Sequence, residues 1–183
     1  MTEVEKLVAA YRERVQIPWQ PQLSVPERVW MLVYPPELER RVRRQFSEFR
    51  RETEAAGRKW LQLDLLADFA TWMSKHDYRD SYFADPNLLE QDAFDPLRQA
   101  VIDRVQAVLE SADADTVTAI LGAASLFGFV HLSSVLDNRK LKMRGRLLVC
   151  FPGSHGEHSY RLLDARSNYN YQASPITTSG ATR

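Results

Sequence analysis

Four short runs of β-forming residues alternate with segments of helical periodicity, and this alternation limits the possible folds more than any other feature. Strands separated by helices form right-handed βαβ units, in which the strands are parallel and the helices cover the sheet. We therefore expect a three-layer α/β fold, with a mostly parallel sheet of about four strands and helices on both faces. The expected strands are Val29 to Tyr34, Trp60 to Leu65, Thr116 to Leu121 and Arg146 to Phe151.

The pattern predicts a single α/β domain over residues 1–176. Residues 1–22 should form an N-terminal amphipathic helix, whose apolar side chains recur at helical spacing, and a proline-rich linker. The segment after the fourth strand should form a short hairpin or an edge strand, and residues 177–183 should form a flexible polar tail. Further helices are expected over residues 38–53, 66–74 and 127–136 and from Asp95 onward.

The charge pattern does not by itself identify a class of partner. The chain has 24 basic and 24 acidic residues, so its formal net charge is zero. Residues 64–115 contain twelve acidic and four basic residues, whereas residues 139–183 contain eight basic and two acidic residues. Such regions can attract partners of opposite charge. The single cysteine, and the lack of a signal peptide or a long apolar run, predict a cytoplasmic protein that does not bind membranes.

The residues after the first expected strand do not resemble a phosphate-binding loop. Such loops use glycines whose N–H groups face the phosphate, whereas this chain has Tyr34-Pro35-Pro36-Glu37 at that position. The two prolines lack N–H donors, and the Glu37 carboxylate repels phosphate. Neither common glycine-rich nucleotide motif occurs elsewhere in the chain. We therefore predict a degenerate nucleoside-triphosphatase-like core that has no phosphate loop and binds no cofactor.

Three features suggest catalysis or metal binding, but none of the patterns is specific. Asp64 ends the second strand, as a magnesium-binding aspartate would, but aspartate is also a common helix cap after a strand. Cys150 lies within an apolar run, which is typical of an inert buried thiol. His155, Glu157 and His158 could bind a metal ion, but they lie on a loop and lack fixed helical spacing. We predict neither a catalytic residue nor a metal site, and a metal-dependent hydrolase or nuclease that uses these residues is the alternative.

The loop before the fourth strand is strongly basic and could contact a nucleic acid. Because it precedes a strand, it should lie at the edge of the sheet opposite the strand carboxyl ends. A solvated loop is the simpler interpretation, so direct nucleic-acid contact is not expected, and a nucleic-acid-binding accessory protein is a further alternative. The candidate basic patch consists of Arg139, Lys140, Lys142, Arg144 and Arg146.

The carboxyl ends of the strands are the expected position of a functional surface, because ligands of open α/β sheets bind there. The segment after the fourth strand combines tyrosines and arginines, which are common anchors at interfaces. The helix over residues 38–53, whose arginines lie off its apolar face, could extend this surface. The aromatic residues between Trp72 and Phe83 could form a partner patch, although packing in the core is their more common fate. The candidate interaction rim consists of Phe151, Pro152, Gly153, Tyr160, Arg161, Asp164, Arg166, Tyr169, Asn170 and Tyr171.

Several stretches resemble the BrxB family of bacteriophage-exclusion (BREX) defence systems. They are RVWMLVYPPEL (residues 28–38), WLQLDL (60–65), LVCFPG (148–153) and YRLLDAR (160–166), with Asn170-Tyr171 and Pro175-Ile176 after them. The resemblance implies a non-catalytic component that acts beside an adenine methyltransferase, a large ATPase and PglZ, a protein of the alkaline-phosphatase superfamily. It further implies an adaptor that binds other BREX proteins, with PglZ as the expected partner, and it assigns no catalytic residue.

Overall fold

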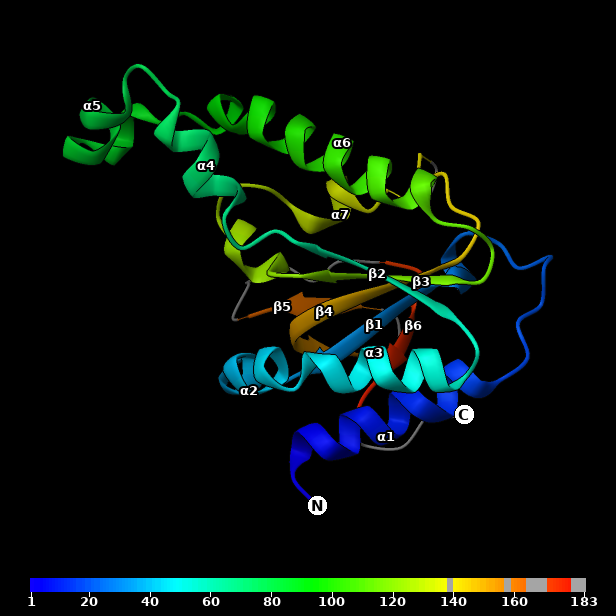
Figure 1. The fold of residues 1–183 in the computed structure, drawn as a ribbon. Helices are drawn as coiled ribbons and strands as arrows, with labels where there is room; N and C mark the ends of the chain where they lie inside the picture. Colours follow the sequence, from blue (N-terminus) through cyan, green and yellow to red (C-terminus); the bar gives the residue numbers. More distant parts are fainter. Residues whose placement is uncertain (138–139, 157–158, 164–170, 179–183) are drawn as a thin grey trace.

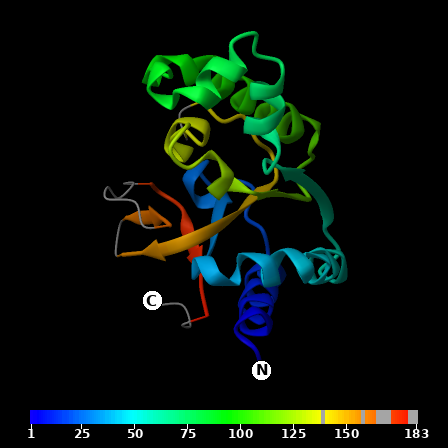
Figure 2. The same cartoon turned by 90° about the vertical axis from the view of Figure 1, so that its left-hand side faces the viewer.

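The computed structural model describes residues 1–137, 140–156, 159–163 and 171–178. These residues form one sheet between two layers of helices (Figures 1 and 2). The described sheet has six strands in the order β2-β3-β4-β1-β6, with β5 paired to the end of β4. The strands are β1 (Val29–Tyr34), β2 (Lys59–Asp64), β3 (Thr116–Leu121), β4 (Arg146–His155), β5 (Tyr160–Leu162) and β6 (Ser174–Ile176).

Parallel pairing joins β2 to β3, β3 to β4, β4 to β1 and β1 to β6. The carboxyl ends of these strands therefore share one edge of the sheet, and their amino ends share the opposite edge. The predicted α/β class and mostly parallel sheet are confirmed, but the sheet has six strands rather than about four. The two extra strands, β5 and β6, have three residues each, too few to show a clear periodic pattern. As expected, β5 forms an antiparallel hairpin with β4, and β6 lies at an edge.

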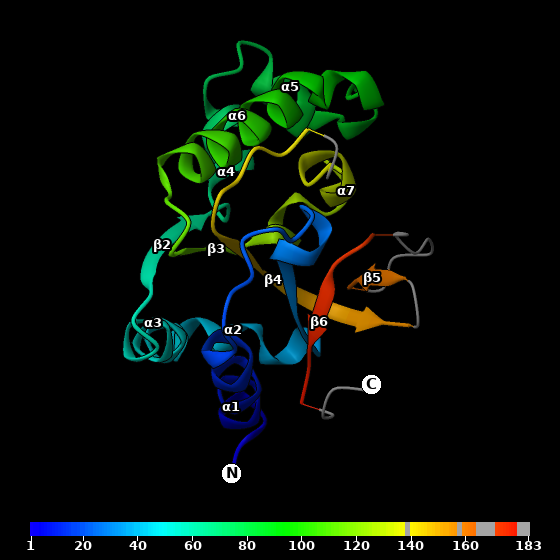
Figure 3. The same ribbon diagram turned by 90° about the vertical axis from the view of Figure 1, so that its right-hand side faces the viewer.

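Helices cover both faces of the sheet, as predicted (Figure 3). The first face carries α1 (Glu3–Gln16), α2 (Glu39–Arg44) and α3 (Phe46–Ala55). The opposite face carries α4 (Asp68–Ser74), α6 (Asp95–Ser111) and α7 (Leu132–Val135), while α5 (Arg79–Ala84) projects beyond α4. The 3₁₀ turns are η1 (Pro26–Arg28), η2 (Pro36–Leu38), η3 (Pro86–Leu88), η4 (Gln91–Phe94) and η5 (Ala123–Leu126).

The sheet divides the core into two halves because successive side chains of a strand point to opposite faces. All six residues of β1 are buried, which requires cover on both sides. Met31 and Val33 pack with α6 and α7, whereas Trp30 and Leu32 pack with α1 and α3. This inner strand therefore holds both layers of helices together.

The first helix is fixed by a capping box and by a buried tyrosine. The Thr2 N–H donates to the Glu5 carboxylate (2.6 Å), and the Thr2 hydroxyl accepts from the Glu5 N–H, so two N–H groups at the helix start are satisfied. The Tyr11 ring meets Trp30 of β1 and Phe49 of α3 edge-on. Its hydroxyl lies 2.5 Å from that of Thr53, and the contact is buried. These contacts join α1 to the domain.

Two predicted helices differ from the observed ones. The helix over residues 38–53 is divided at Gln45, whose φ and ψ are −100° and 14°. The prediction of a helix over residues 127–136 is wrong, because only Leu132–Val135 is α-helical there. Gly128 adopts a φ of +83°, which interrupts a right-handed helix. Leu126 and Val130 are buried from a 3₁₀ turn and a loop instead of from one helix face, and Phe127 is exposed.

Residues 179–183 of the predicted tail lie outside the described residues, so its flexibility stays a prediction. None of the helices in the described part of the chain is long and apolar enough to cross a membrane.

We expect Tyr11→Phe to lower the free energy of unfolding by about 1 kcal/mol, because it removes the buried hydrogen bond to Thr53 and keeps the ring. Tyr11→Ala should lower it by about 3–5 kcal/mol, since the contacts with Trp30 and Phe49 are lost as well. Urea denaturation followed by circular dichroism measures both changes, and Tyr78→Phe on an exposed site is the matched control. A Tyr11→Phe variant as stable as that control would contradict the role of this hydrogen bond.

Candidate functional site at the carboxyl edge of the sheet

An ion pair joins two connections at the carboxyl edge. Arg43 of α2 donates two hydrogen bonds to Asp64 at the end of β2, from Nη1 to Oδ2 (2.7 Å) and from Nη2 to Oδ1 (3.0 Å). Oδ1 also accepts a hydrogen bond from the Leu66 N–H (2.9 Å). Because α2 follows β1, the pair links the inner strand β1 to the edge strand β2. Both carboxylate oxygens of Asp64 are engaged, and α4 begins only at Asp68, so Asp64 does not cap that helix.

The network extends from Arg43 to the end of β1. Arg43 Nε donates to Glu39 Oε1 (3.0 Å), and the Tyr34 hydroxyl donates to Glu39 Oε2 (2.6 Å). The thiol of Cys150 lies beside Tyr34 in the core. Burial and then the charge of Glu39 raise the pKa of Cys150, and burial also raises the pKa of Tyr34. Neither group is therefore an anionic nucleophile at neutral pH.

The ion pair keeps both of its members charged. Hydrogen bonds from Arg43 lower the pKa of Asp64, against the opposing effect of partial burial. The same hydrogen bonds raise the pKa of Arg43. The side chains are 24% and 40% exposed, so water screens their attraction and the pair contributes only modestly to stability.

Gly122, which follows β3, provides the space in which this pair forms. Its φ is +75°, and a Cβ there would lie 2.7 Å from the Leu66 nitrogen and 2.8 Å from Asp64 Oδ1. Arg43 Nη2 would be 3.0 Å away. The network thus fastens the ends of β1, β2 and β3, and its polar atoms bond mainly to one another.

The structure corrects the candidate rim. Phe151 and Tyr160 are 0% and 4% exposed, and Pro152 and Tyr171 are buried as well. These side chains cannot form an exposed recognition surface, because β5 folds back along β4 and places them in the core. The Tyr160 hydroxyl donates to the Ala173 carbonyl (2.8 Å), which ties β5 to the segment before β6.

Few described members of the rim are accessible. Gly153 is half-buried, since a Cβ there would lie 2.0 Å from the Arg161 carbonyl oxygen across the β4–β5 hairpin. Arg161 itself is exposed. The remaining members, Asp164, Arg166, Tyr169 and Asn170, lie outside the described residues.

The histidine loop is described only in part. His155 is exposed at the end of β4, and its Nδ1 lies 3.1 Å from the Gly156 carbonyl oxygen. Glu157 and His158 lie outside the described residues, so the metal-binding alternative stays untested. Its fourth proposed member, Asp64, is already bound to Arg43.

The basic patch lies at the amino edge of the sheet, as its position before β4 predicts. Lys140, Lys142 and Arg144 are exposed. Arg146 is only 4% exposed, so its place in a solvated patch is wrong. Its guanidinium carbon lies 4.7 Å from the centre of the Trp19 ring, because the linker after α1 folds over it. Arg139 lies outside the described residues.

Residues 75–90, which include α5 and η3 and which we name the aromatic arm, project from the carboxyl edge beyond α4 (Figures 1 and 3). Tyr78, Phe83 and Leu88 are 66%, 67% and 54% exposed. The arm is attached to the core by rings: His76 meets Trp72 and Tyr82, with centroids 5.4 and 5.0 Å apart. The predicted aromatic patch is therefore divided, since Trp72 belongs to the core attachment and the tip is exposed.

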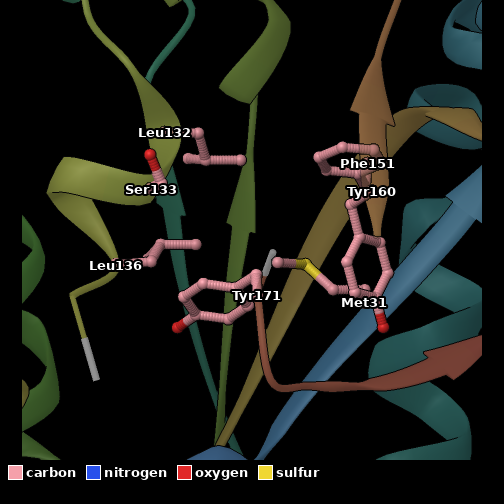
Figure 4. A pocket seen from close by; sticks show the side chains of 7 residues that line it. All are labelled: Met31, Leu132, Ser133, Leu136, Phe151, Tyr160 and Tyr171. Carbon is pink, nitrogen blue, oxygen red and sulfur yellow. The ribbon is translucent and has the colours of Figure 1, made fainter. Parts of the chain in front are cut away.

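A small cavity lies between α7 and the sheet (Figure 4). Its volume is about 10 Å³, roughly the space that one water molecule requires. It is therefore too small for a nucleotide or a metabolite. The lining residues are Met31, Leu132, Ser133, Leu136, Phe151, Tyr160 and Tyr171.

Comparisons of the chain with family models, with curated proteins and with solved structures found no match in any of the three.

We expect Arg43→Gln to lower the free energy of unfolding at pH 7 by about 1 kcal/mol. A lowered carboxyl pKa stabilises the fold above the unfolded-state pKa of about 3.9, and this contribution is lost as the pH falls through the lower folded-state pKa. The difference between wild type and variant should therefore shrink below about pH 4. Urea denaturation at pH 7, 5 and 3 measures it, with Arg50→Gln on exposed α3 as the control. A difference that persists at pH 3 would show that the pair is not its source.

Gly122→Ala should destabilise the protein by at least about 1–2 kcal/mol more than Gly128→Ala. Both glycines have positive φ, so both substitutions carry similar backbone strain. A Cβ at Gly128 meets nothing within 4 Å, whereas one at Gly122 collides with the Leu66 amide and Asp64. Thermal denaturation of the two variants compares them, and equal losses would rule out the close approach at Gly122.

Proposed function

We propose that the chain is a non-catalytic adaptor that binds another protein through the aromatic arm. The observation that carries this proposal is the exposure of Tyr78, Phe83 and Leu88 on one projecting segment. Large apolar side chains gathered at the surface are typical of sites that another protein covers. The ring contacts of His76 hold the arm in place, so less conformational entropy is lost on binding.

The charge of the arm defines the chemistry of the partner. The arm contains four acidic residues and two basic residues. Complementary potentials guide association and exclude wrong partners. The partner surface should therefore combine an apolar recess for Phe83 and Tyr78 with a border of lysines and arginines.

The resemblance to the BrxB family supports a particular setting for this adaptor. We assign the chain to a BREX phage-defence system of the bacterial cytoplasm, with PglZ as the partner whose surface receives the arm. The proposal includes a core related to nucleoside triphosphatases that has lost its phosphate loop. In support, exposed Pro35 and Pro36 follow β1 where phosphate-binding N–H groups would be needed. The saturated Arg43–Asp64 network agrees with an absence of catalysis at this edge.

Co-expression with PglZ followed by size-exclusion chromatography tests the proposal, and we expect co-elution at micromolar concentration. Phe83→Asp and Tyr78→Asp should each weaken the dissociation constant at least about tenfold, because buried aromatic anchors dominate interface energy. Ile17→Asp is the matched control, since Ile17 is 57% exposed but lies in the linker after α1. Added salt should also weaken binding, because the proposed contacts at the border are charged.

Separate elution of the wild-type proteins would refute PglZ as the partner. If the complex forms and the two arm variants bind as tightly as Ile17→Asp, the contact lies elsewhere and the arm is excluded.

A further inference from the structure

Two arginines cover one tryptophan at the amino edge of the sheet, and a third arginine lies beside one of them. The guanidinium carbons of Arg58 and Arg146 lie 4.3 and 4.7 Å from the centre of the Trp19 ring. Arg28, the last residue of η1, lies beside Arg146, the first residue of β4, because the residues that follow them, Val29 and Leu147, pair in the sheet. We name Trp19, Arg28, Arg58 and Arg146 the arginine cluster.

The arginine cluster has more positive charge than the residues around it neutralise. Arg58 forms an ion pair with Asp115. Within the described residues, neither Arg28 nor Arg146 has a carboxylate partner, although Arg146 is only 4% exposed. Burial, and then the charges of Arg28 and Arg58, lower the pKa of Arg146. Buried cations in proteins are normally paired with an anion, and this one is not.

Backbone carbonyl groups account for only part of this arrangement. Arg28 donates to the carbonyls of Pro21, Met143 and Arg144, and Arg146 donates to that of Gln20 (3.3 Å). The carboxyl ends of α1 and α3 also lie at this edge, each with a partial negative charge of about one half (Figure 1). Three arginines, one aspartate and two helix ends still leave an excess of about one positive charge.

Two N–H donors of the cluster have no acceptor among the described residues. They are Trp19 Nε1 and Arg28 Nε, and both atoms are buried. An unsatisfied buried donor costs about 1–3 kcal/mol, so these atoms mark a position where an acceptor is missing. The exposed Lys142 and Arg144 precede Arg146 directly in the sequence and add positive charge at the same edge.

We propose that the arginine cluster binds one phosphate group. A phosphate carries one or two negative charges and four oxygens, which suits the excess charge and the two orphan donors. A single carboxylate has only two oxygens. Since two guanidinium groups already cover the Trp19 ring, the cluster offers contacts to phosphate and not a stacking face for a base. The phosphate could belong to a small molecule or to a nucleic-acid backbone, and the two sources are separable by experiment.

Isothermal titration of the full chain with sodium phosphate, at ionic strength held constant with chloride, tests the site. We expect a dissociation constant of about 1 mM or tighter. Arg58→Gln should weaken binding about tenfold, because a charge-assisted contact is lost. Trp19→Phe keeps an aromatic ring but removes the indole N–H, so it should weaken phosphate binding about threefold. Arg50→Gln, which changes an exposed arginine paired with Glu54, should bind as the wild type does.

Asp115→Asn gives a test that does not depend on loss of function. Asp115 competes with phosphate for Arg58, so its neutralisation should tighten phosphate binding about threefold. If the cluster only fixed the linker after α1 to the domain, Asp115→Asn would not tighten phosphate binding. Binding of a fluorescent duplex DNA of arbitrary sequence, measured by fluorescence anisotropy, distinguishes the two possible sources of the phosphate. Duplex binding that is lost in Arg58→Gln and falls steeply with salt identifies a nucleic-acid backbone, whereas binding of free phosphate alone identifies a small molecule.

The proposal is overturned if neither phosphate nor the duplex binds, or if Arg58→Gln, Trp19→Phe and Asp115→Asn all behave as the wild type does. Binding of a poly-glutamate peptide without phosphate binding would also overturn it and would make the cluster a contact for an acidic protein. These results are independent of the co-elution experiment with PglZ, which concerns the opposite edge of the sheet.

Discussion

The pairing of β1 with β4 is the interaction on which the rest of the structure depends. Six residue pairs run in register from Val29–Leu147 to Tyr34–Pro152, and every residue of β1 is buried. A parallel pair at the centre of a sheet must be covered on both faces, which requires the two layers of helices. Parallel strands also force all carboxyl ends to one edge and all amino ends to the other. The Arg43–Asp64 network and the arginine cluster are consequences of this separation.

The layered architecture could be predicted because each central strand is an apolar run bounded by turn residues. Local patterns were less informative where tertiary contacts decide the outcome. The apolar residues around Gly128 are compatible with a helix, but the left-handed backbone conformation of Gly128 interrupts the segment. β5 and β6 have too few residues to form a pattern, and they exist because β4 and β1 offer them free edges.

The candidate site was predicted in position but not in detail. Sequence position correctly put Phe151 and Tyr160 near the strand ends, but it could not show that the hairpin buries them. The spacing of Glu39 and Arg43 by one helical turn indicates their pairing. The partner Asp64 lies 21 residues from Arg43, and no local pattern reveals such a contact. Likewise, the sequence around Arg146 predicts a solvent-exposed side chain, because it does not show that the distant linker with Trp19 covers this residue.

The sheet separates two distinct surfaces, one at each edge, although the chain has no net charge. The carboxyl edge carries the acidic aromatic arm, whereas the amino edge carries the arginine cluster with exposed Lys142 and Arg144. Charged surfaces at separate edges can each orient a partner of opposite charge as it approaches. The sheet keeps the two surfaces apart, so occupation of one does not block the other. The parallel sheet is therefore the rigid connection between the aromatic arm and the arginine cluster.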